Sequence, residues 1–283
     1  MEILLAESAG FCFGVKRAVD TVYEQLEKGY SPIYTYGPII HNENVVEDLK
    51  SKGIAIIDEN SNVAEIKKGT VIIRSHGVKK SVVDELAAEG FTIIDATCPF
   101  VKKIHNLVKT ASENGDYIVI IGNHDHPEVQ GIVGWIQEGA DYSVINGALE
   151  AKMLRVEKGR KITIVSQTTF NFNKFNELVE IIDKKGYDSN AVNTICNATE
   201  VRQTEAFSIS TKVDTMFVVG GKSSSNTQKL YEICRVNCPN TYYIQTAGDI
   251  GSDMLMDAEK IGITAGASTP NNIIEEVQVA CQN

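Results

Sequence analysis

Short hydrophobic runs alternate with amphipathic stretches along the whole chain. The runs are four to six residues long, rich in Ile and Val, and bounded by glycine or polar residues, which is typical of buried strands. The predicted strands are 2–6, 33–36, 54–57, 71–74, 91–95, 117–121, 142–145, 161–165, 191–194, 214–219, 242–245 and 260–264. Segments with apolar residues at helical spacing lie between most of them, and the first, 15–26, ends at Gly29.

This alternation predicts an α/β fold with mostly parallel sheets. Ligands of such sheets bind beyond the carboxyl ends of the strands. The cysteines and histidines that could carry chemistry fall mainly at those ends in this chain. The strand ends are therefore the expected place of a functional site.

The stretch DATCP, residues 95–99, ends one predicted strand and starts a helical pattern. Proline is favoured at the first helical position, so Cys98 should lie at a helix N-terminus, where backbone N–H groups and the helix dipole favour a thiolate. The next predicted strand, 117–121, leads to His126 and Glu128. We expect the two strands and their helix to form one βαβ unit.

A similar arrangement occurs three times along the chain. The cysteines that precede predicted helices are Cys12, Cys98 and Cys196. The polar strand ends that follow them after 28 or 29 residues are His41, His126 and Ser224. A second polar strand end in each repeat contains His76, Thr168 or Ser268. We therefore predict three α/β units around a pseudo-threefold axis, with the three thiolates at the centre.

The domain boundaries follow from this repeat. We expect units at 1–96, 97–193 and 194–268, with the last segment, 269–283, returning to the first unit. A chain of 283 residues is long enough for two or three domains with cores of their own.

Charge and hydropathy exclude several classes of partner. The net charge of −10, without any basic block, argues against nucleic acid. No hydrophobic run is long enough to span a membrane, and the first six residues are too few and too acidic for a signal peptide. We expect a soluble, cytoplasmic protein.

The other three of the six cysteines, Cys234, Cys238 and Cys281, are interpreted as buried thiols. The three converging thiolates could hold zinc or an iron–sulfur cluster. Structural zinc prefers four ligands supplied by local pairs, and no CxxC pair occurs here. A cluster with three cysteine ligands leaves one iron open, where a substrate can bind. Three simply buried cysteines remain the alternative.

The polar strand ends also supply hydrogen-bond donors. The histidines that donate when protonated are His41, His76 and His126, and the neutral donors are Thr168, Ser224, Ser225, Asn226 and Ser268. Such a set suits an acceptor-rich diphosphate. Residues 221–226 end a strand and open a helix, whose N-terminus can bind phosphate, although serine-rich helix starts usually only cap.

Glu128 is the candidate proton donor. Pro127 suits the first turn of a helix and would hold Glu128 near the predicted cluster. A carboxyl group there should be desolvated, which raises its pKa and lets it donate a proton near neutral pH, and Thr168 could hold it in place. The alternative is that Glu128 only interacts favourably with a helix N-terminus.

These residues lie in short motifs whose order is specific, although each motif alone is weak. The motifs are GFCFGV from Gly10, HN from His41, SHGV from Ser75, ATCP from Ala96, HPEV from His126, SQTT from Ser166, CNAT from Cys196, SSN from Ser224 and TAGAS, which includes Ser268. In this order the chain resembles the 4-hydroxy-3-methylbut-2-enyl diphosphate reductase family over essentially its whole length, with no departure at a motif position.

The resemblance implies a trefoil of three α/β domains around a [4Fe–4S] cluster held by Cys12, Cys98 and Cys196. It implies loss of the substrate's allylic hydroxyl, giving isopentenyl and dimethylallyl diphosphate, with electrons from ferredoxin or flavodoxin. Carried over by motif, the residues that bind the diphosphate are His41, His76, Ser224, Ser225, Asn226 and Ser268. Those that serve the hydroxyl end and proton delivery are His126, Glu128 and Thr168.

Two other functions stay open at this point. A metal-dependent phosphohydrolase would need no cysteine, would be colourless, and could use His41, His76, His124, His126 and Glu128. A binding module, such as a cluster-bearing sensor, would bind its ligand without turnover.

Overall fold

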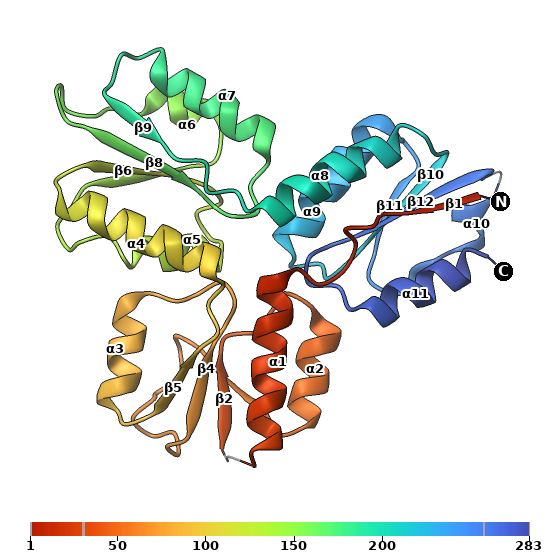
Figure 1. Cartoon of the computed structure of the whole chain (residues 1–283), viewed down its shortest axis with the longest axis horizontal. Coiled ribbons are helices and arrows are strands. Elements are labelled where there is room, and N and C mark those ends of the chain that lie inside the picture. Colours follow the sequence, from red (N-terminus) through yellow and green to blue (C-terminus); the bar gives the residue numbers. More distant parts are fainter. Residues whose placement is uncertain (1, 30–31, 257, 283) are drawn as a thin grey trace. The chain divides into compact units, whose positions relative to one another are not determined.

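The structure is a computed structural model that describes residues 2–29, 32–256 and 258–282 (Figure 1). Within these residues, helices and strands alternate along the chain, and the strands form three four-stranded parallel sheets. The predicted fold class, three α/β domains with parallel sheets, is confirmed.

We name each sheet after the earlier of its two central strands in chain order. The β2 sheet has the order β3-β2-β4-β5 and consists of β2 (Ile33–Tyr36), β3 (Ala55–Ile57), β4 (Thr70–Ile73) and β5 (Thr92–Asp95). The helices in this part of the chain are α1 (Phe13–Glu27), α2 (Glu43–Ser51) and α3 (Lys80–Ala88).

The β6 sheet has the order β7-β6-β8-β9 and consists of β6 (Tyr117–Ile121), β7 (Tyr142–Ile145), β8 (Ile162–Ser166) and β9 (Ser189–Ala191). Its helices are α4 (Pro99–Glu113), α5 (Pro127–Val133), α6 (Ala148–Met153) and α7 (Phe172–Asp183).

The β10 sheet has the order β1-β12-β10-β11 and consists of β1 (Glu2–Leu5), β10 (Thr215–Val219), β11 (Thr241–Ile244) and β12 (Lys260–Ala265). The helices that follow Cys196 are α8 (Asn197–Ser210), α9 (Ser225–Asn237), the 3₁₀ turn η1 (Ala247–Asp249), α10 (Ser252–Leu255) and α11 (Asn271–Ala280).

Hydrophobic cores lie on both faces of the β6 sheet. Ile118 and Ile120 pack with residues of α4 and α5, whereas Val119 and Ile121 pack with residues of α6 and α7. Successive side chains of a strand point to opposite faces, so a strand covered on both sides must be hydrophobic throughout. This explains why the strands of this chain are continuous apolar runs.

The three sheets share one strand order. In the β2 and β6 sheets, the strand that comes third in chain order lies between the strands that come first and fourth. In the β10 sheet, β10, β11 and β12 have the same arrangement as the first three strands of the other sheets. Strand β1 lies beside β12, in the place that the fourth strand takes in the other two sheets. The fourth strand of each sheet therefore leads toward a cysteine: β1 to Cys12, β5 to Cys98 and β9 to Cys196.

Two predictions about neighbours are wrong. The strand expected at 2–6 does not belong with the rest of 1–96, because β1 pairs with β12. The strands at 91–95 and 117–121 do not form one βαβ unit, because β5 pairs with β4 and β6 with β7 and β8. The apolar side of α4 packs onto the β6 sheet instead of returning to β5.

The C-terminal segment also differs from the expectation. Ile274 and Val277 of α11 pack in the core of the β10 sheet, together with Ile263 of β12 and Ile3 of β1. Residues 269–282 therefore return to the N-terminal segment, whose strand β1 belongs to the β10 sheet. The exact boundaries at 96, 193 and 268 stay predictions.

One strand is displaced from its predicted position. We expected 191–194, but β9 ends at Ala191. Beyond it, the Thr194 hydroxyl donates to the Ser166 carbonyl at 2.6 Å and accepts the Ser166 N–H at 2.7 Å. A side chain thus replaces the backbone ladder where the chain leaves the sheet toward Cys196.

The chain divides into two compact units. One contains the described residues of Met1–Lys16, Ile40–Asp48 and Cys196–Asn283, and the other contains those of Arg17–Ile39 and Leu49–Ile195. We call them the first and the second unit and describe each by itself. None of the helices in the described parts combines the length and hydropathy that a membrane span requires.

Candidate active site

The three candidate cysteines lie at helix starts, as predicted. Cys98 and Cys196 are the N-cap residues of α4 and α8, and Pro99 occupies the first turn of α4. Cys12 directly precedes α1. All three thiols are half-buried and free of disulfides. The positive end of each helix lowers the free energy of a thiolate at these positions.

The remaining cysteines lie in hydrophobic cores of the β10 sheet: Cys234, Cys238 and Cys281. Burial raises the pKa of Cys234 to about 12 and that of Cys281 to about 11. A thiol that stays protonated is a poor metal ligand. These positions agree with the interpretation of all three as structural thiols.

No three His, Cys, Asp or Glu side chains in the described parts of the chain lie close enough together to hold a metal ion. Cys12 and Cys196 belong to the first unit and Cys98 to the second. The meeting of the three cysteines therefore stays a prediction. Their chemistry fits an iron–sulfur cluster, because the thiols are partly exposed, free of disulfides and placed at electropositive helix ends.

Hydrogen bonds in the first unit join Cys12 to predicted substrate residues. The N–H of Cys12 donates to the Ala267 carbonyl at 3.1 Å, and the N–H of Ala267 donates to Asn226 Oδ1 at 2.9 Å. The Ser268 hydroxyl donates to the His41 carbonyl at 2.9 Å. Four segments that are far apart in sequence thus converge at the carboxyl end of the β10 sheet.

Asn226 has hydrogen-bonding capacity left for a ligand. Its side chain is 4% exposed, and Nδ2 has no hydrogen-bond partner among the residues described. Because Oδ1 accepts the Ala267 N–H, the orientation of the amide is set. A buried donor without a partner costs about 1–3 kcal/mol, which an acceptor oxygen of a bound molecule would remove.

The predicted diphosphate residues Ser224, Ser225 and Asn226 form the start of α9. Ser224 Oγ is the helix cap and accepts the Thr227 N–H at 3.2 Å and the Thr227 hydroxyl at 2.8 Å. A thirteen-residue helix carries a positive N-terminus, which favours an anion at this strand end.

In the second unit, Cys98 is joined to the segment that carries His76. The Cys98 N–H donates to the Ser75 carbonyl at 2.9 Å. The His76 ring meets the His126 ring edge-on, with 5.7 Å between centroids and an angle of 74°. These two predicted substrate residues, from different sheets, therefore lie side by side.

The backbone sets the tautomer of His126. This residue caps α5, and its Nδ1 accepts the Glu128 N–H at 3.1 Å. Nδ1 thus carries no proton, so the ring proton of neutral His126 is on Nε2. His126 is 8% exposed, and in this form it offers a fixed N–H donor at the edge of its ring.

Glu128 is held by Thr168, as predicted. Oε1 accepts the Thr168 N–H at 2.6 Å, and Oε2 accepts the Thr168 hydroxyl at 2.7 Å. The side chain is 1% exposed. Burial raises the pKa of Glu128 to about 7, even though both hydrogen bonds from Thr168 act in the opposite direction. The direction of this shift agrees with the prediction, and a carboxyl group in such a position can carry or release a proton near neutral pH.

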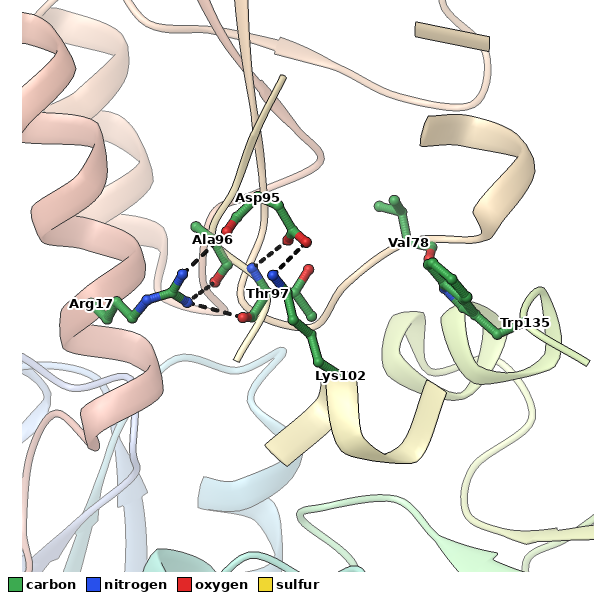
Figure 2. A network of polar contacts seen from close by, with 7 residues as sticks. All are labelled: Arg17, Val78, Asp95, Ala96, Thr97, Lys102 and Trp135. Carbon is green, nitrogen blue, oxygen red and sulfur yellow. Dashed lines mark hydrogen bonds and ion pairs between the residues drawn. The ribbon is translucent and has the colours of Figure 1, made fainter. Parts of the chain in front are cut away.

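A network around Arg17 holds the backbone that precedes Cys98 (Figure 2). The guanidinium donates to the carbonyls of Ala96 at 3.2 Å and Thr97 at 2.9 Å, and to the Asp95 carbonyl at 3.2 Å. The Asp95 carboxylate accepts the Thr97 N–H at 2.9 Å and pairs with Lys102 at 2.6 Å. The loop that presents Cys98 is therefore held on both sides.

His105 supports the same region from α4. Its ring stacks on Trp135, with 5.1 Å between centroids, and the Trp135 Nε1–H donates to the Val78 carbonyl at 2.9 Å. Burial lowers the pKa of His105 to about 4, so the ring is neutral at pH 7. A Cβ atom on Gly77 would lie 2.7 Å from His105 Cε1, which shows how closely the His76 turn packs onto α4.

The residues named for the phosphohydrolase alternative are distributed over both units. His124 is half-exposed and contacts Glu150 at 3.2 Å. His41 belongs to the first unit, whereas His76, His126 and Glu128 belong to the second.

Three residues that hold backbone or rings in these regions were missed in the sequence: Arg17, His105 and Arg202, whose guanidinium donates to the Gly10 and Ala198 carbonyls. Arg202 had a readable signal, because it falls in the buried stripe of α8 with Thr199, Ala206 and Ile209. An arginine on the buried face of a helix is expected to have a polar or charged partner inside the protein. Arg17 and His105 had no comparable signal, because their partners are backbone groups and an aromatic ring far away in sequence.

A model of the LytB protein family matches residues 3–282. The chain belongs to the LytB family. The 4-hydroxy-3-methylbut-2-enyl diphosphate reductase of Caldanaerobacter subterraneus subsp. tengcongensis is 49% identical over 278 residues, which are 98% of this chain and 95% of that protein. The enzyme of the same name from Alkaliphilus oremlandii is 45% identical over 280 residues, 98% of either chain.

Solved structures agree with this LytB assignment. The E-1-hydroxy-2-methyl-but-2-enyl-4-diphosphate reductase of Plasmodium falciparum has a TM-score of 0.94 and 29% identity, covering 100% of this chain and 88% of that one. A second structure, an (E)-4-hydroxy-3-methyl-but-2-enyl diphosphate reductase described as the terminal enzyme of the non-mevalonate pathway, has a TM-score of 0.72 and 40% identity, covering 100% and 99%. The resemblance predicted from the motifs is confirmed.

The raised pKa of Glu128 predicts a pH-dependent stability. The folded protein binds the proton of Glu128 more tightly than the unfolded chain does. The protonated carboxyl group therefore contributes to the free energy of unfolding fully below pH 4.5, and this contribution is lost as the pH rises to about 7. Glu128→Gln should therefore gain roughly 3 kcal/mol of stability relative to wild type across that interval. Denaturant midpoints measured at a series of pH values test this.

The control for this titration is Glu150→Gln. Hydrogen bonding from the Asn146 N–H lowers the pKa of Glu150, so its contribution has the opposite sign and is lost as the pH falls. Parallel stability curves for wild type and Glu128→Gln would show that Glu128 titrates normally.

Gly77→Ala should be more destabilising than an ordinary glycine substitution. Gly77 has φ +72°, and an added Cβ would also lie 3.0 Å from Thr97 Cγ2. Gly115→Ala is the matched control, because φ is +86° and no atom lies within 4 Å of the added Cβ. The control should cost about 1–2 kcal/mol and Gly77→Ala about 1–3 kcal/mol more, as measured by chemical denaturation. Equal costs would contradict the packing of His105 on this turn.

Proposed function

We infer that this chain is a reductase that removes the allylic hydroxyl of 4-hydroxy-3-methylbut-2-enyl diphosphate and forms isopentenyl and dimethylallyl diphosphate. The family, the names of the relatives and the solved structures all support this reaction. The observation that carries it is the buried Glu128 carboxyl group, held by Thr168 and poised to release a proton near neutral pH.

The reaction needs a proton donor at the hydroxyl. Two electrons and two protons enter, the carbon–oxygen bond breaks, a carbon–hydrogen bond forms, and water leaves. A hydroxide ion is a poor leaving group, so protonation of the departing oxygen lowers the barrier. A general acid for this step should have a pKa near the working pH, and Glu128 meets that requirement.

Thr168 and His126 orient the hydroxyl end of the substrate in this proposal. Thr168 contributes both a backbone and a side-chain hydrogen bond to the Glu128 carboxyl group, so the acid has little rotational freedom. His126 contributes the N–H at Nε2, because Nδ1 is occupied by the Glu128 N–H. A fixed donor beside a fixed acid positions an oxygen for protonation.

The diphosphate end has a separate set of residues. The proposed ligands are His41, His76, Ser224, Ser225, Asn226 and Ser268. The N-terminus of α9 and the available Nδ2 donors of Asn226 support an anion at this place. A site without a lysine or arginine cluster depends on helix N–H groups, neutral donors and histidine charge.

Cys12, Cys98 and Cys196 would hold a [4Fe–4S] cluster with one open iron. When bound, such a cluster supplies single electrons and a Lewis-acid position for the substrate oxygen. The chain's own contribution is three thiolates favoured by helix N-termini. Ferredoxin or flavodoxin as electron donor and a cytoplasmic location stay predictions.

Glu128→Gln should give a folded, cluster-loaded protein with turnover reduced at least about a hundredfold, the usual scale for loss of a general acid. Steady-state reduction with a viologen donor, alongside iron analysis, measures this. Glu150→Gln, on the exposed surface beside His124, is the matched control and should keep normal turnover. More than about a third of wild-type turnover in Glu128→Gln would exclude the proton-donor role.

Single Cys→Ser substitutions should separate the six cysteines into two groups. Loss at Cys12, Cys98 or Cys196 should strip or cripple the cluster, whereas Cys234, Cys238 and Cys281 should be dispensable for it because they are buried in apolar cores. Iron and sulfide analysis and the visible spectrum after anaerobic purification decide this. Full iron content in Cys98→Ser, or a colourless wild type, would refute the assignment.

A further inference from the structure

Arg202 is a buried arginine whose backbone contacts lie close in sequence to two of the proposed cluster ligands. It lies on α8 in the first unit, and its side chain is 4% exposed. Nη2 donates to the Gly10 carbonyl at 2.6 Å, and Nη1 donates to the Ala198 carbonyl at 3.1 Å. Gly10 precedes Cys12 by two residues and Ala198 follows Cys196 by two. One guanidinium thus joins the backbone beside both cysteines.

The third nitrogen of this guanidinium is available. Nε is buried and has no hydrogen-bond partner among the described residues. An unpartnered buried N–H on a charged group is costly, so its persistence needs a compensating acceptor when the site is complete. Thiolate and sulfide sulfurs are acceptors of this kind, and hydrogen bonds to them tune iron–sulfur centres.

No carboxylate in the described chain forms an ion pair with Arg202. Glu205, on the same helix, acts on Arg202 electrostatically without forming an ion pair, and its carboxylate accepts the N–H groups of Glu7 at 2.7 Å and Ser8 at 2.9 Å. Burial lowers the pKa of Arg202, whereas Cys12, Cys196 and then Glu205 act in the opposite direction. As thiolate ligands of a cluster, Cys12 and Cys196 would supply negative charge beside this buried cation.

A second arginine makes a similar contact in the second unit. Arg17, on the helix after Cys12, donates to the carbonyls of Ala96 and Thr97 directly before Cys98 (Figure 2). Arg17 is on the helix that follows Cys12 and holds the backbone before Cys98. Arg202 is on the helix that follows Cys196 and holds the backbone before Cys12. Arg202 differs from Arg17 because it is almost completely buried.

We propose that Arg202 is a positioning residue for the iron–sulfur centre, which holds the backbone at Cys12 and Cys196 in place and fixes one positive charge beside these two ligands. This inference rests on the proposed function. A fixed positive charge stabilises the more negative, reduced state of the centre, so it raises the reduction potential. The two backbone hydrogen bonds should also slow the loss of iron.

The test compares Arg202→Gln, Arg202→Lys and Arg235→Gln in anaerobically purified, cluster-loaded protein. Arg235→Gln is the matched control, because it removes the same charge from an exposed position of the first unit, where Arg235 contacts Tyr231. The measurements are iron and sulfide content, the rate of iron loss to a chelator, and the one-electron reduction potential at constant pH.

Arg202→Gln should disfavour the reduced state at least about tenfold, which is a negative shift of about 59 mV for one electron. Arg202→Lys keeps the charge but cannot span two carbonyls in the same way, so it should retain most of the potential and still lose iron several-fold faster than wild type. Arg235→Gln should change neither quantity.

An unchanged potential and chelator rate in Arg202→Gln would overturn the proposal, and so would an equal shift in Arg235→Gln. If Arg202→Gln does not fold, Arg202→Lys decides, and a wild-type rate of iron loss in that variant would refute the positioning role. A wild type that binds no iron would instead refute the proposed function itself.

Discussion

The junction between a parallel edge strand and a helix N-terminus is the constraint on which the site depends. Each of the three sheets has a fourth strand that leads to a cysteine, and each cysteine is followed by a helix that starts within one residue. Ligands bind beyond the carboxyl ends of the strands, and the helix N-termini there provide the positive potential that favours a thiolate or a phosphate. The strand order β1-β12-β10-β11 shows how strict this constraint is, because the first strand of the chain completes a sheet built from its last third.

Desolvation decides what the polar groups at these junctions can do. Burial raises the pKa of the Glu128 carboxyl group to about 7 and keeps the His105 ring neutral. It also leaves the Nδ2 donor of Asn226 without an acceptor among the described residues. In each case water is excluded by packed hydrophobic strands, so a hydrogen bond or charge is worth more than at the surface. Thr168 holds Glu128 in position but does not offset the cost of burying its charge, which is why the proton stays available.

Chemically similar residues differ in role because of where the fold puts them. Cys234 lies within α9 and inside an apolar core, whereas Cys98 caps the N-terminus of α4 and is partly exposed. Glu150 and Glu128 differ in the same way, since one meets His124 at the surface and the other is enclosed with Thr168. The reductase structure from Plasmodium falciparum, with 29% identity and a TM-score of 0.94, shows that the same fold forms although most residues differ.

The amino-acid sequence by itself determined the elements, the fold class and most of the candidate residues. Continuous apolar runs mark strands that are covered on both faces, and a cysteine before a proline marks a helix start, so both are local properties that a sequence carries directly. Glu128 and Thr168 were also paired correctly, because each follows a strand in the same repeat. The tertiary structure alone decided which strands are neighbours, as with β1 beside β12 and β5 apart from β6. It also decided that Arg17 and Arg202 hold the backbone near the cysteines. Their partners are backbone carbonyls 79 and 192 residues away in the sequence. Every residue has a backbone carbonyl, so no sequence pattern could reveal these partners.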